Sequence, residues 1–113
     1  MILHLDLLKY WTIIEYQLQD NKMNSEKLNQ VLKLIQDGKS NEARKIFNEI
    51  LPEETVEYLM VLGNLEQKFQ NWAKAINAYS KILQIDPENF EAKNRIKMIQ
   101  SILNFWNPEM FNP

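Results

Sequence analysis

Two stretches of this sequence, 32 residues apart, repeat one pattern of small, aromatic and aliphatic residues. They are DGKSNEARKIFNEIL, which ends at Leu51, and FQNWAKAINAYSKIL, which ends at Leu83. A small residue allows two helix backbones to approach, and the aromatic residue one turn later fills the space beside it. Repetition at such a period indicates structural units that stack on one another. The matched pairs are Ala43 with Ala75, Phe47 with Tyr79, Ile50 with Ile82, and Leu51 with Leu83.

The spacing of apolar residues is helical along the whole chain, and only two Gly and four Pro interrupt it. We therefore expect an all-α fold without strands. The polar stretch QDNKMNS, residues 19–25, is expected to be a loop between the first two helices. Six helices are expected, of which the first spans residues 2–20 and the second spans residues 25–37 and is ended by Gly38. The third is capped by Ser40 or Asn41, carries Ala43 to Leu51 and is stopped by Pro52, which also opens the fourth helix, running to about Phe69. The fifth carries Trp72 to Leu83, and the sixth is capped by Asp86, opened by Pro87 and reaches Trp106.

The first expected helix is apolar on two faces. One stripe contains Leu3, Leu7, Trp11, Ile14 and Leu18, and a second contains Ile2, Leu5, Ile13 and Tyr16. Such a helix is covered on both sides or joins another chain. Charged residues interrupt it too often for a membrane-spanning segment or a signal peptide, so we expect a soluble, cytoplasmic protein.

Residues 62–89, LGNLEQKFQNWAKAINAYSKILQIDPEN, closely resemble a tetratricopeptide repeat (TPR). The family's Leu-Gly pair falls on Leu62-Gly63, its small residue on Ala75, its aromatic residues on Trp72 and Tyr79, and its closing proline on Pro87. Two positions depart from the pattern: Glu66 replaces an aromatic residue, and Gln70 replaces the turn glycine.

The resemblance implies one domain over residues 1–113, folded as a right-handed α-α superhelix of about six antiparallel helices. Residues 24–55 resemble a degenerate repeat in which Gly38, Ala43 and Phe47 fit and Pro52 comes early. Residues 56–89 form the clear repeat, and residues 90–106 resemble a capping helix. Residues 1–20 are expected to complete the stack as part of a leading unit or as a cap. The tail, residues 107–113, resembles the aromatic-rich ends of small TPR proteins from Bacteroidetes-type bacteria.

The composition argues against several classes of function. The 13 basic and 15 acidic side chains give a net charge of −2, whereas nucleic-acid binding depends on concentrated positive charge. There is no Cys, and the single His4 has no partner for metal binding or for acid-base chemistry. Charge at a helix N-terminus explains Glu53, Glu54 and Glu57 without catalysis. We therefore expect a protein that is not an enzyme and that needs no metal or cofactor.

In TPR arrays the first helix of each pair lines a concave groove that binds a peptide or a partner helix. The resemblance implies that Asn64 holds the backbone of a bound peptide, although this asparagine also belongs to the usual sequence of the repeat. The carboxylate clamp of TPR co-chaperones is not expected, because only Arg95 stands at a matching position. The groove residues implied are Glu57, Met60, Asn64, Gln67, Lys68, Glu91, Asn94, Arg95 and Met98.

Three hypotheses on function follow. The first is a scaffold or adaptor that binds a protein or peptide partner in the groove. The second is self-association into a homodimer or larger oligomer, through the apolar first helix or through the last helix and tail. The third is a piece of a larger assembly. Lys93, Arg95 and Lys97 form either a solvated helix face or a site for an acidic or phosphorylated peptide. The tail, residues 107–113, is expected to fold over Met98 and Ile102 or to dock on a neighbouring copy.

Overall fold

The chain is all-helical over the residues that its structure describes. This structure is a computed structural model, which describes the backbone of residues 2–106 and the side chains from residue 8 onward. It contains five helices and, within that range, no strand. The expected all-α class is confirmed. The helices are α1 (Ile2–Gln36), α2 (Ser40–Phe47), α3 (Val56–Lys68), α4 (Trp72–Ile85) and α5 (Phe90–Trp106).

The first two expected helices are one continuous helix, α1, so the loop predicted at residues 19–25 is wrong. The physical reason is that neither Gly nor Pro occurs before Gly38, and a few polar residues cost a helix only a few tenths of a kcal/mol each. The end of α1 was predicted correctly. Gly38 has a φ of 79°, and the Lys39 amide donates to the Leu34 carbonyl at 2.8 Å, which closes the last turn.

Two other boundaries differ from the prediction. α2 ends at Phe47 rather than near Leu51, because the Glu49 and Ile50 amides donate to carbonyls three residues back, at Ile46 and Phe47, and do not continue the α-helical pattern. Leu51 is 77% exposed, unlike the half-buried Leu83. α3 begins at Val56, where the Thr55 hydroxyl accepts a hydrogen bond from the Tyr58 amide at 3.2 Å. Pro52 therefore does not open this helix.

The last helix is capped one turn later than predicted. The side chain of Asn89 accepts a hydrogen bond from the Ala92 amide at 2.9 Å, which makes Asn89 the N-cap of α5. Asp86 instead ends α4, and Pro87 lies in the turn between the two helices. Asn89 also donates to Asp86 at 3.3 Å, so the turn is held from both sides.

The core runs through the stack from the last third of α1 to α5. Three of the four repeated pairs are buried in it: Ala43 with Ala75, Phe47 with Tyr79, and Ile50 with Ile82. Gly63 of α3 lies directly against the Tyr79 ring of α4, where a β-carbon would come within 2.7 Å of Cζ. The absence of a side chain thus sets the spacing of these two helices. The other large buried apolar residues are Leu28, Val31, Ile35, Tyr58, Leu59, Val61, Leu65 and Ile99.

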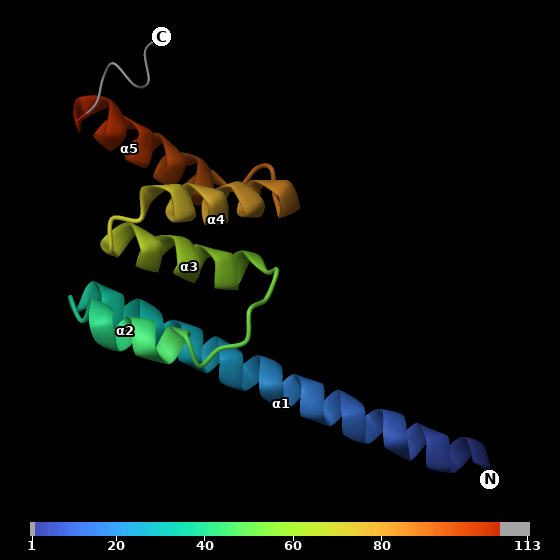
Figure 1. The fold of residues 1–113 in the computed structure, drawn as a ribbon. Helices are drawn as coiled ribbons and strands as arrows, with labels where there is room; N and C mark the ends of the chain where they lie inside the picture. The colour runs from blue at the N-terminus through green and yellow to red at the C-terminus, as the bar shows by residue number, and fades with distance from the viewer. Residues whose placement is uncertain (1, 107–113) are drawn as a thin grey trace.

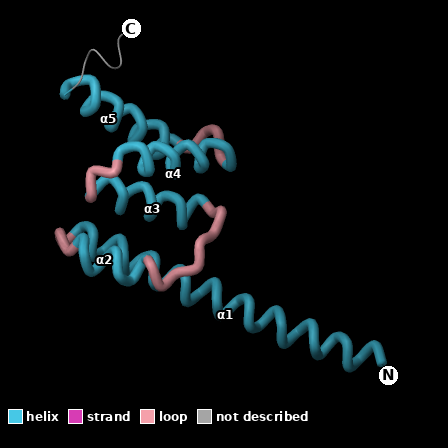
Figure 2. The backbone as a smooth tube through the Cα atoms, viewed as in Figure 1, coloured by secondary structure: helices cyan, strands magenta, loops and turns pink. Residues whose placement is uncertain are grey.

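The helices form successive layers, and one end of α1 projects from them (Figure 1). The loops alternate between the two ends of the stack, so neighbouring helices run antiparallel (Figure 2). The radius of gyration is 18.7 Å, whereas a compact chain of this length has roughly 13 Å. Residues 8–23, which we name the α1 arm, are exposed at every position. The expectation that the N-terminal helix completes the stack is therefore wrong for these residues.

Candidate functional site

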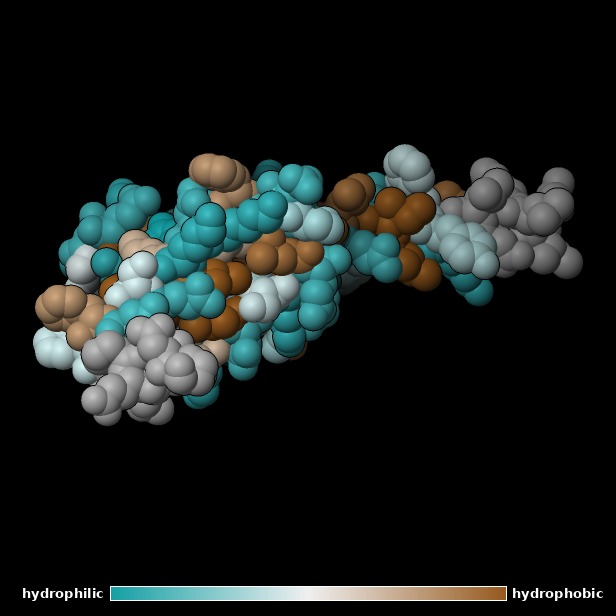
Figure 3. Space-filling view, turned by 90° about the horizontal axis from the view of Figure 1, so that it is seen from above, coloured by the Kyte–Doolittle hydropathy of each residue, from teal (hydrophilic) through white to brown (hydrophobic). Residues whose placement is uncertain are grey.

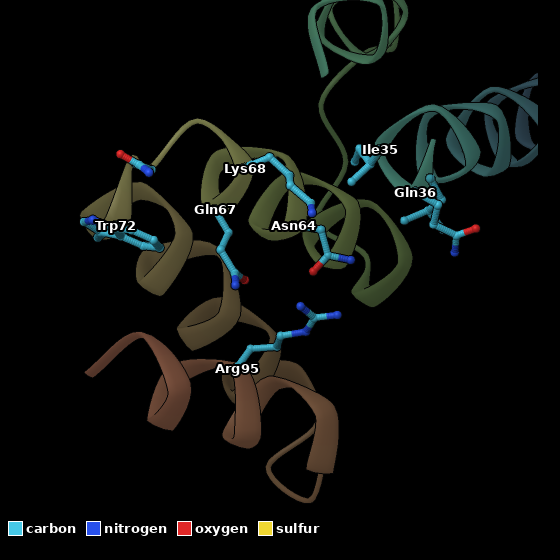
Figure 4. Close-up of a pocket in the computed structure, with 9 residues that line it drawn as sticks. Ile35, Gln36, Asn64, Gln67, Lys68, Trp72 and Arg95 are labelled. Carbon is cyan, nitrogen blue, oxygen red and sulfur yellow. The ribbon is translucent and has the colours of Figure 1, made fainter. Parts of the chain in front are cut away.

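A pocket of about 390 Å³ lies where the end of α1, the α3–α4 turn and α5 face one another (Figure 4). Four of the residues implied by the TPR resemblance line it: Asn64, Gln67, Lys68 and Arg95. The other lining residues are Leu32, Ile35, Gln36, Gln70 and Trp72. Residues from four separate segments of the chain thus meet in one hollow.

The hydroxyl of Tyr79 holds two amide side chains of the pocket, those of Asn64 and Gln67, from the side of the core. This hydroxyl lies 2.6 Å from Oδ1 of Asn64 and 3.1 Å from Oε1 of Gln67, so one proton is shared between two acceptors. Burial raises the pKa of Tyr79 to about 12; the Arg95 charge opposes this shift and the Glu91 charge adds to it. The phenol therefore stays protonated, and it fixes both carboxamides with their oxygens toward the core.

This arrangement assigns different roles to the two ends of the Asn64 carboxamide. The oxygen is used inside the protein, whereas Nδ2 makes no hydrogen bond to any other described residue. An amide nitrogen with free protons can donate to a carbonyl or carboxylate oxygen. Asn64 thus bonds to the core through its oxygen and lines the pocket, and its role in holding a peptide stays a prediction.

The pocket carries positive charge and no acidic lining residue. Arg95 reaches toward Asn64 from α5, and Lys68 lies on the opposite wall (Figure 4). Arg95 makes only a long pair with Glu91, at 3.8 Å, and Lys68 makes no ion pair with the residues described. Leu32, Ile35 and Trp72 supply apolar surface beside these charges. The site can therefore hold a group that combines an acidic end with an apolar part.

The other implied groove residues lie outside this pocket. Glu57 is at the opposite end of α3, where the Ser25 hydroxyl donates to its Oε1 at 3.3 Å. Met60 is half-buried against the core, and Asn94 and Met98 are exposed on α5 without lining the pocket. The structure thus gathers four of the nine residues expected, three from α3 and one from α5.

The lining residues that sequence reasoning missed come from the end of α1 and from the α3–α4 turn. Ile35 and Gln36 precede the glycine that ends α1, and no pattern in the sequence shows that this helix end faces α5. Gln70 has a φ of 59° at the position where the repeat usually has glycine. That departure was visible in the sequence and was the available signal for this turn.

The second departure from the repeat, Glu66, is buried and paired. Its Oε1 lies 2.6 Å from Nη1 of Arg44, and Nδ2 of Asn71 donates to its Oε2 at 2.7 Å. Burial alone would raise the pKa of Glu66, but these hydrogen bonds outweigh it and lower the pKa below its ordinary value of 4.5. Arg44 also lies 4.7 Å above the Phe69 ring. This cluster fastens α2 to α3 and serves the fold.

The remaining charged candidates have ordinary partners. Glu53 and Glu54 directly precede Thr55, the N-cap of α3, and Glu57 lies in its first turn, so all three are near a helix N-terminus, as predicted. Asn24 donates to Glu53 at 2.7 Å, and Lys81 is 3.7 Å from Glu54. In the basic cluster of α5, Lys93 pairs with Glu88 at 3.9 Å. The His4 side chain and the tail, residues 107–113, lie outside the described residues.

Two features that would point to a function, a metal site and a membrane-spanning helix, are absent from the described residues. Among the described residues, no group of three or more His, Asp or Glu is placed to hold a metal ion. Within the same part of the chain, none of the helices has the length and apolar character needed to cross a membrane. Comparisons with protein families, with curated proteins and with solved structures find no match to this chain.

Proposed function

We propose that this protein is an interaction module of the TPR type, a scaffold or adaptor that binds a peptide or partner helix on the concave side of its helical stack. The observation that carries the proposal is the pocket in which Asn64, Gln67, Lys68 and Arg95 meet. Their amide and cationic groups are hydrogen-bond donors at fixed positions, which suits recognition of a partner's oxygen atoms.

The chemistry of the pocket favours an acidic segment. The guanidinium of Arg95 is available to a carboxylate or phosphate, and charge-assisted hydrogen bonds of this kind are stronger than neutral ones. Lys68 adds a second charge, and Nδ2 of Asn64 can donate to the peptide backbone. A neighbouring apolar side chain of the partner would pack against Leu32 and Trp72.

A peptide-selection experiment tests this proposal. Wild-type protein is expected to enrich acidic peptides from a random library, and Arg95→Gln is expected to weaken the best of them at least about tenfold, the loss of one charge-assisted contact. Lys93→Gln is the matched control, because Lys93 lies on the same helix but does not line the pocket. Equal binding by wild type and Arg95→Gln would sink the proposal.

Self-association is a second candidate function, and the exposed α1 arm favours it. Eight large apolar residues of the arm are between 46% and 67% exposed: Leu8, Tyr10, Trp11, Ile13, Ile14, Tyr16, Leu18 and Met23. Monomeric proteins rarely show contiguous apolar surface above a few hundred Å². α5 also ends in exposed apolar residues, Phe105 and Trp106, whose rings meet edge to face at 5.6 Å.

A further inference from the structure

The α1 arm carries its apolar side chains in an order that suits a second helix. Figure 3 shows brown patches among teal and pale ones on the part of α1 that projects from the body. Trp11, Ile14 and Leu18 follow one another at intervals of three and four residues. This is the spacing with which one helix packs along another in a coiled coil. We call these three residues the arm seam.

The charges of the arm favour neither a membrane surface nor a charged partner. Residues 8–23 contain two basic residues, Lys9 and Lys22, and two acidic residues, Glu15 and Asp20. Helices that lie on membranes carry an excess of Lys and Arg on their polar face. A neutral arm meets no net repulsion from its own copy. Self-pairing is therefore electrostatically allowed, whereas attraction to an anionic lipid surface is missing.

At Trp11 and Ile14 the seam is complementary to itself in the antiparallel direction. When two arms cross with Trp11 of one copy opposite Ile14 of the other, the two-fold axis places Ile14 opposite Trp11 at the same time. Each wide aromatic residue then faces a smaller aliphatic one, which fills space better than two indoles opposed. The crossing point lies between residues 12 and 13, well away from both bodies.

The parallel direction is blocked by the protein's own body. The intervals of the seam continue along α1 to Leu28, Leu32 and Ile35, where α2 and α3 already cover the helix. A parallel partner helix would have to enter the space that these two helices occupy. An antiparallel partner instead carries its body to the far end, roughly 45 Å away at the level of residue 28, from a rise of about 1.5 Å per residue.

The surface available predicts a weak dimer. Tyr10, Trp11, Ile14 and Leu18 are 65%, 62%, 46% and 62% exposed. At roughly 200 Å² for each large side chain, two copies together bury about 900 Å² of these groups. Interfaces below about 1,200 Å² belong to transient associations rather than permanent ones.

We propose that the α1 arm is a docking surface for a second copy of this chain, which pairs antiparallel through Trp11, Ile14 and Leu18. The proposal rests on the self-association candidate above and assigns it a surface, a direction and a register. It is independent of the pocket, because no residue of the seam lines it.

Analytical ultracentrifugation over a concentration series into the high micromolar range tests the surface. Wild-type protein is expected to show a reversible monomer–dimer equilibrium, and Trp11→Glu is expected to weaken it at least tenfold. Tyr16→Glu is the matched control, because Tyr16 is an equally exposed aromatic residue on the opposite face of the arm, and it should change the constant less than twofold. Both side chains lie outside the core, so both variants should retain the helical content of wild type.

A distance measurement tests the direction. The chain has no cysteine, so Glu26→Cys accepts a single spin label at an exposed position of α1. The antiparallel register places the two labels about 40 Å apart, whereas parallel pairing places them within about 20 Å. The expected result is the long distance, and it should disappear in the Trp11→Glu background.

Each result that would contradict the proposal identifies which part of it is wrong. A monomer at every concentration would remove self-association itself, and with it this proposal, but would leave groove binding intact. A dimer that Trp11→Glu leaves unchanged would keep self-association and overturn the arm as its surface. A short label distance would overturn the antiparallel pairing. Monomeric protein that co-sediments with phosphatidylcholine or phosphatidylserine vesicles through Trp11 would assign the arm to a lipid surface instead.

Discussion

The Tyr79 hydroxyl connects the core to the candidate site at the scale of a single residue. It is buried on α4, and its proton is shared by Asn64 and Gln67 on α3. Those two carboxamides in turn form the wall of the pocket. The orientation of the amide groups in the pocket is therefore set by a residue that does not itself line the pocket.

Replacing Tyr79 by Phe tests this connection through pH. The phenol has a pKa of about 12 when folded and 10.0 ordinarily, so the unfolded chain ionises first as pH rises. Its stabilising contribution is complete below pH 10 and is lost between pH 10 and 12. Tyr79→Phe should cost about 1 kcal/mol at neutral pH, the worth of a typical hydrogen bond. It should also lose stability less steeply than wild type above pH 10.

Urea unfolding at several pH values measures both effects. Other groups that titrate in the alkaline range, such as lysines, are common to the two proteins, so the difference between them isolates the phenol. Parallel stability curves for wild type and Tyr79→Phe above pH 10 would show that this hydroxyl is not held protonated by the fold.

For single residues, the sequence predicts which side chains are buried better than it predicts which side chains pair with one another. The repeat predicts that Ala43, Ala75 and Tyr79 are interior, because small and aromatic residues recur at one period, and these residues are buried. It could not predict that Glu66 would be buried with Arg44, since the two lie 22 positions apart and each alone is typical of a surface. A pairing of charges across two helices depends on their packing, which periodicity does not encode.

At the scale of elements, the α3–α4 hairpin depends on a close approach that leaves no room for a side chain. Gly63 lies against the Tyr79 ring, where an added β-carbon would also come within 2.9 Å of Cδ1. The turn that follows holds Gln70 at a positive φ, and the Asn71 amide donates to the Glu66 carbonyl at 2.9 Å. The hairpin therefore contains two residues that local propensity disfavours: a glycine within a helix at Gly63, and a non-glycine residue with positive φ at Gln70.

In Gly63→Ala, helix propensity and packing are expected to change the free energy of unfolding in opposite directions. Helix propensity alone predicts a gain of about 1 kcal/mol, whereas overpacking against the Tyr79 ring predicts a loss of about 1–3 kcal/mol. We expect the net loss, measured by thermal or urea unfolding. Tyr79→Leu in the same background should recover part of it, so the two effects should not add. A more stable Gly63→Ala protein would mean that the two helices have room to move apart.

The scale of elements also explains the main error of prediction. A polar run such as residues 19–25 is as compatible with an exposed helix as with a loop, and the sequence alone does not distinguish them. What decides here is the missing breaker before Gly38, together with hydrogen bonds from Asn24 to Glu53 and from Ser25 to Glu57. These partners lie about 30 positions away and become visible only in the folded chain.

At the scale of the whole molecule, the protein has a folded body and an arm that contributes little to the body's stability. The core contains no residue of the arm. Leu18 and Leu28 make this contrast within one helix: the first is 62% exposed and the second only 1%. The free energy of unfolding should therefore come almost entirely from residues after the arm.

Alanine substitution of these two leucines tests that division. Leu28→Ala should lower the free energy of unfolding by about 2–5 kcal/mol, the usual cost of a cavity in a core. Leu18→Ala should change it by less than about 0.5 kcal/mol at concentrations where the chain is monomeric. Chemical denaturation of dilute protein measures both. A large effect of Leu18→Ala under these conditions would mean that the arm folds back on the body.

The continuity of α1 has a mechanical consequence. The helix that carries the arm seam also supplies Leu32, Ile35 and Gln36 to the pocket. Leu18 and Ile35 are separated by 17 residues of uninterrupted helix, or about 25 Å of stiff rod. Because Leu32 and Ile35 pack in the core that α1 shares with α2 and α3, a force applied to the arm would be carried along this rod into the core and not to the pocket wall alone.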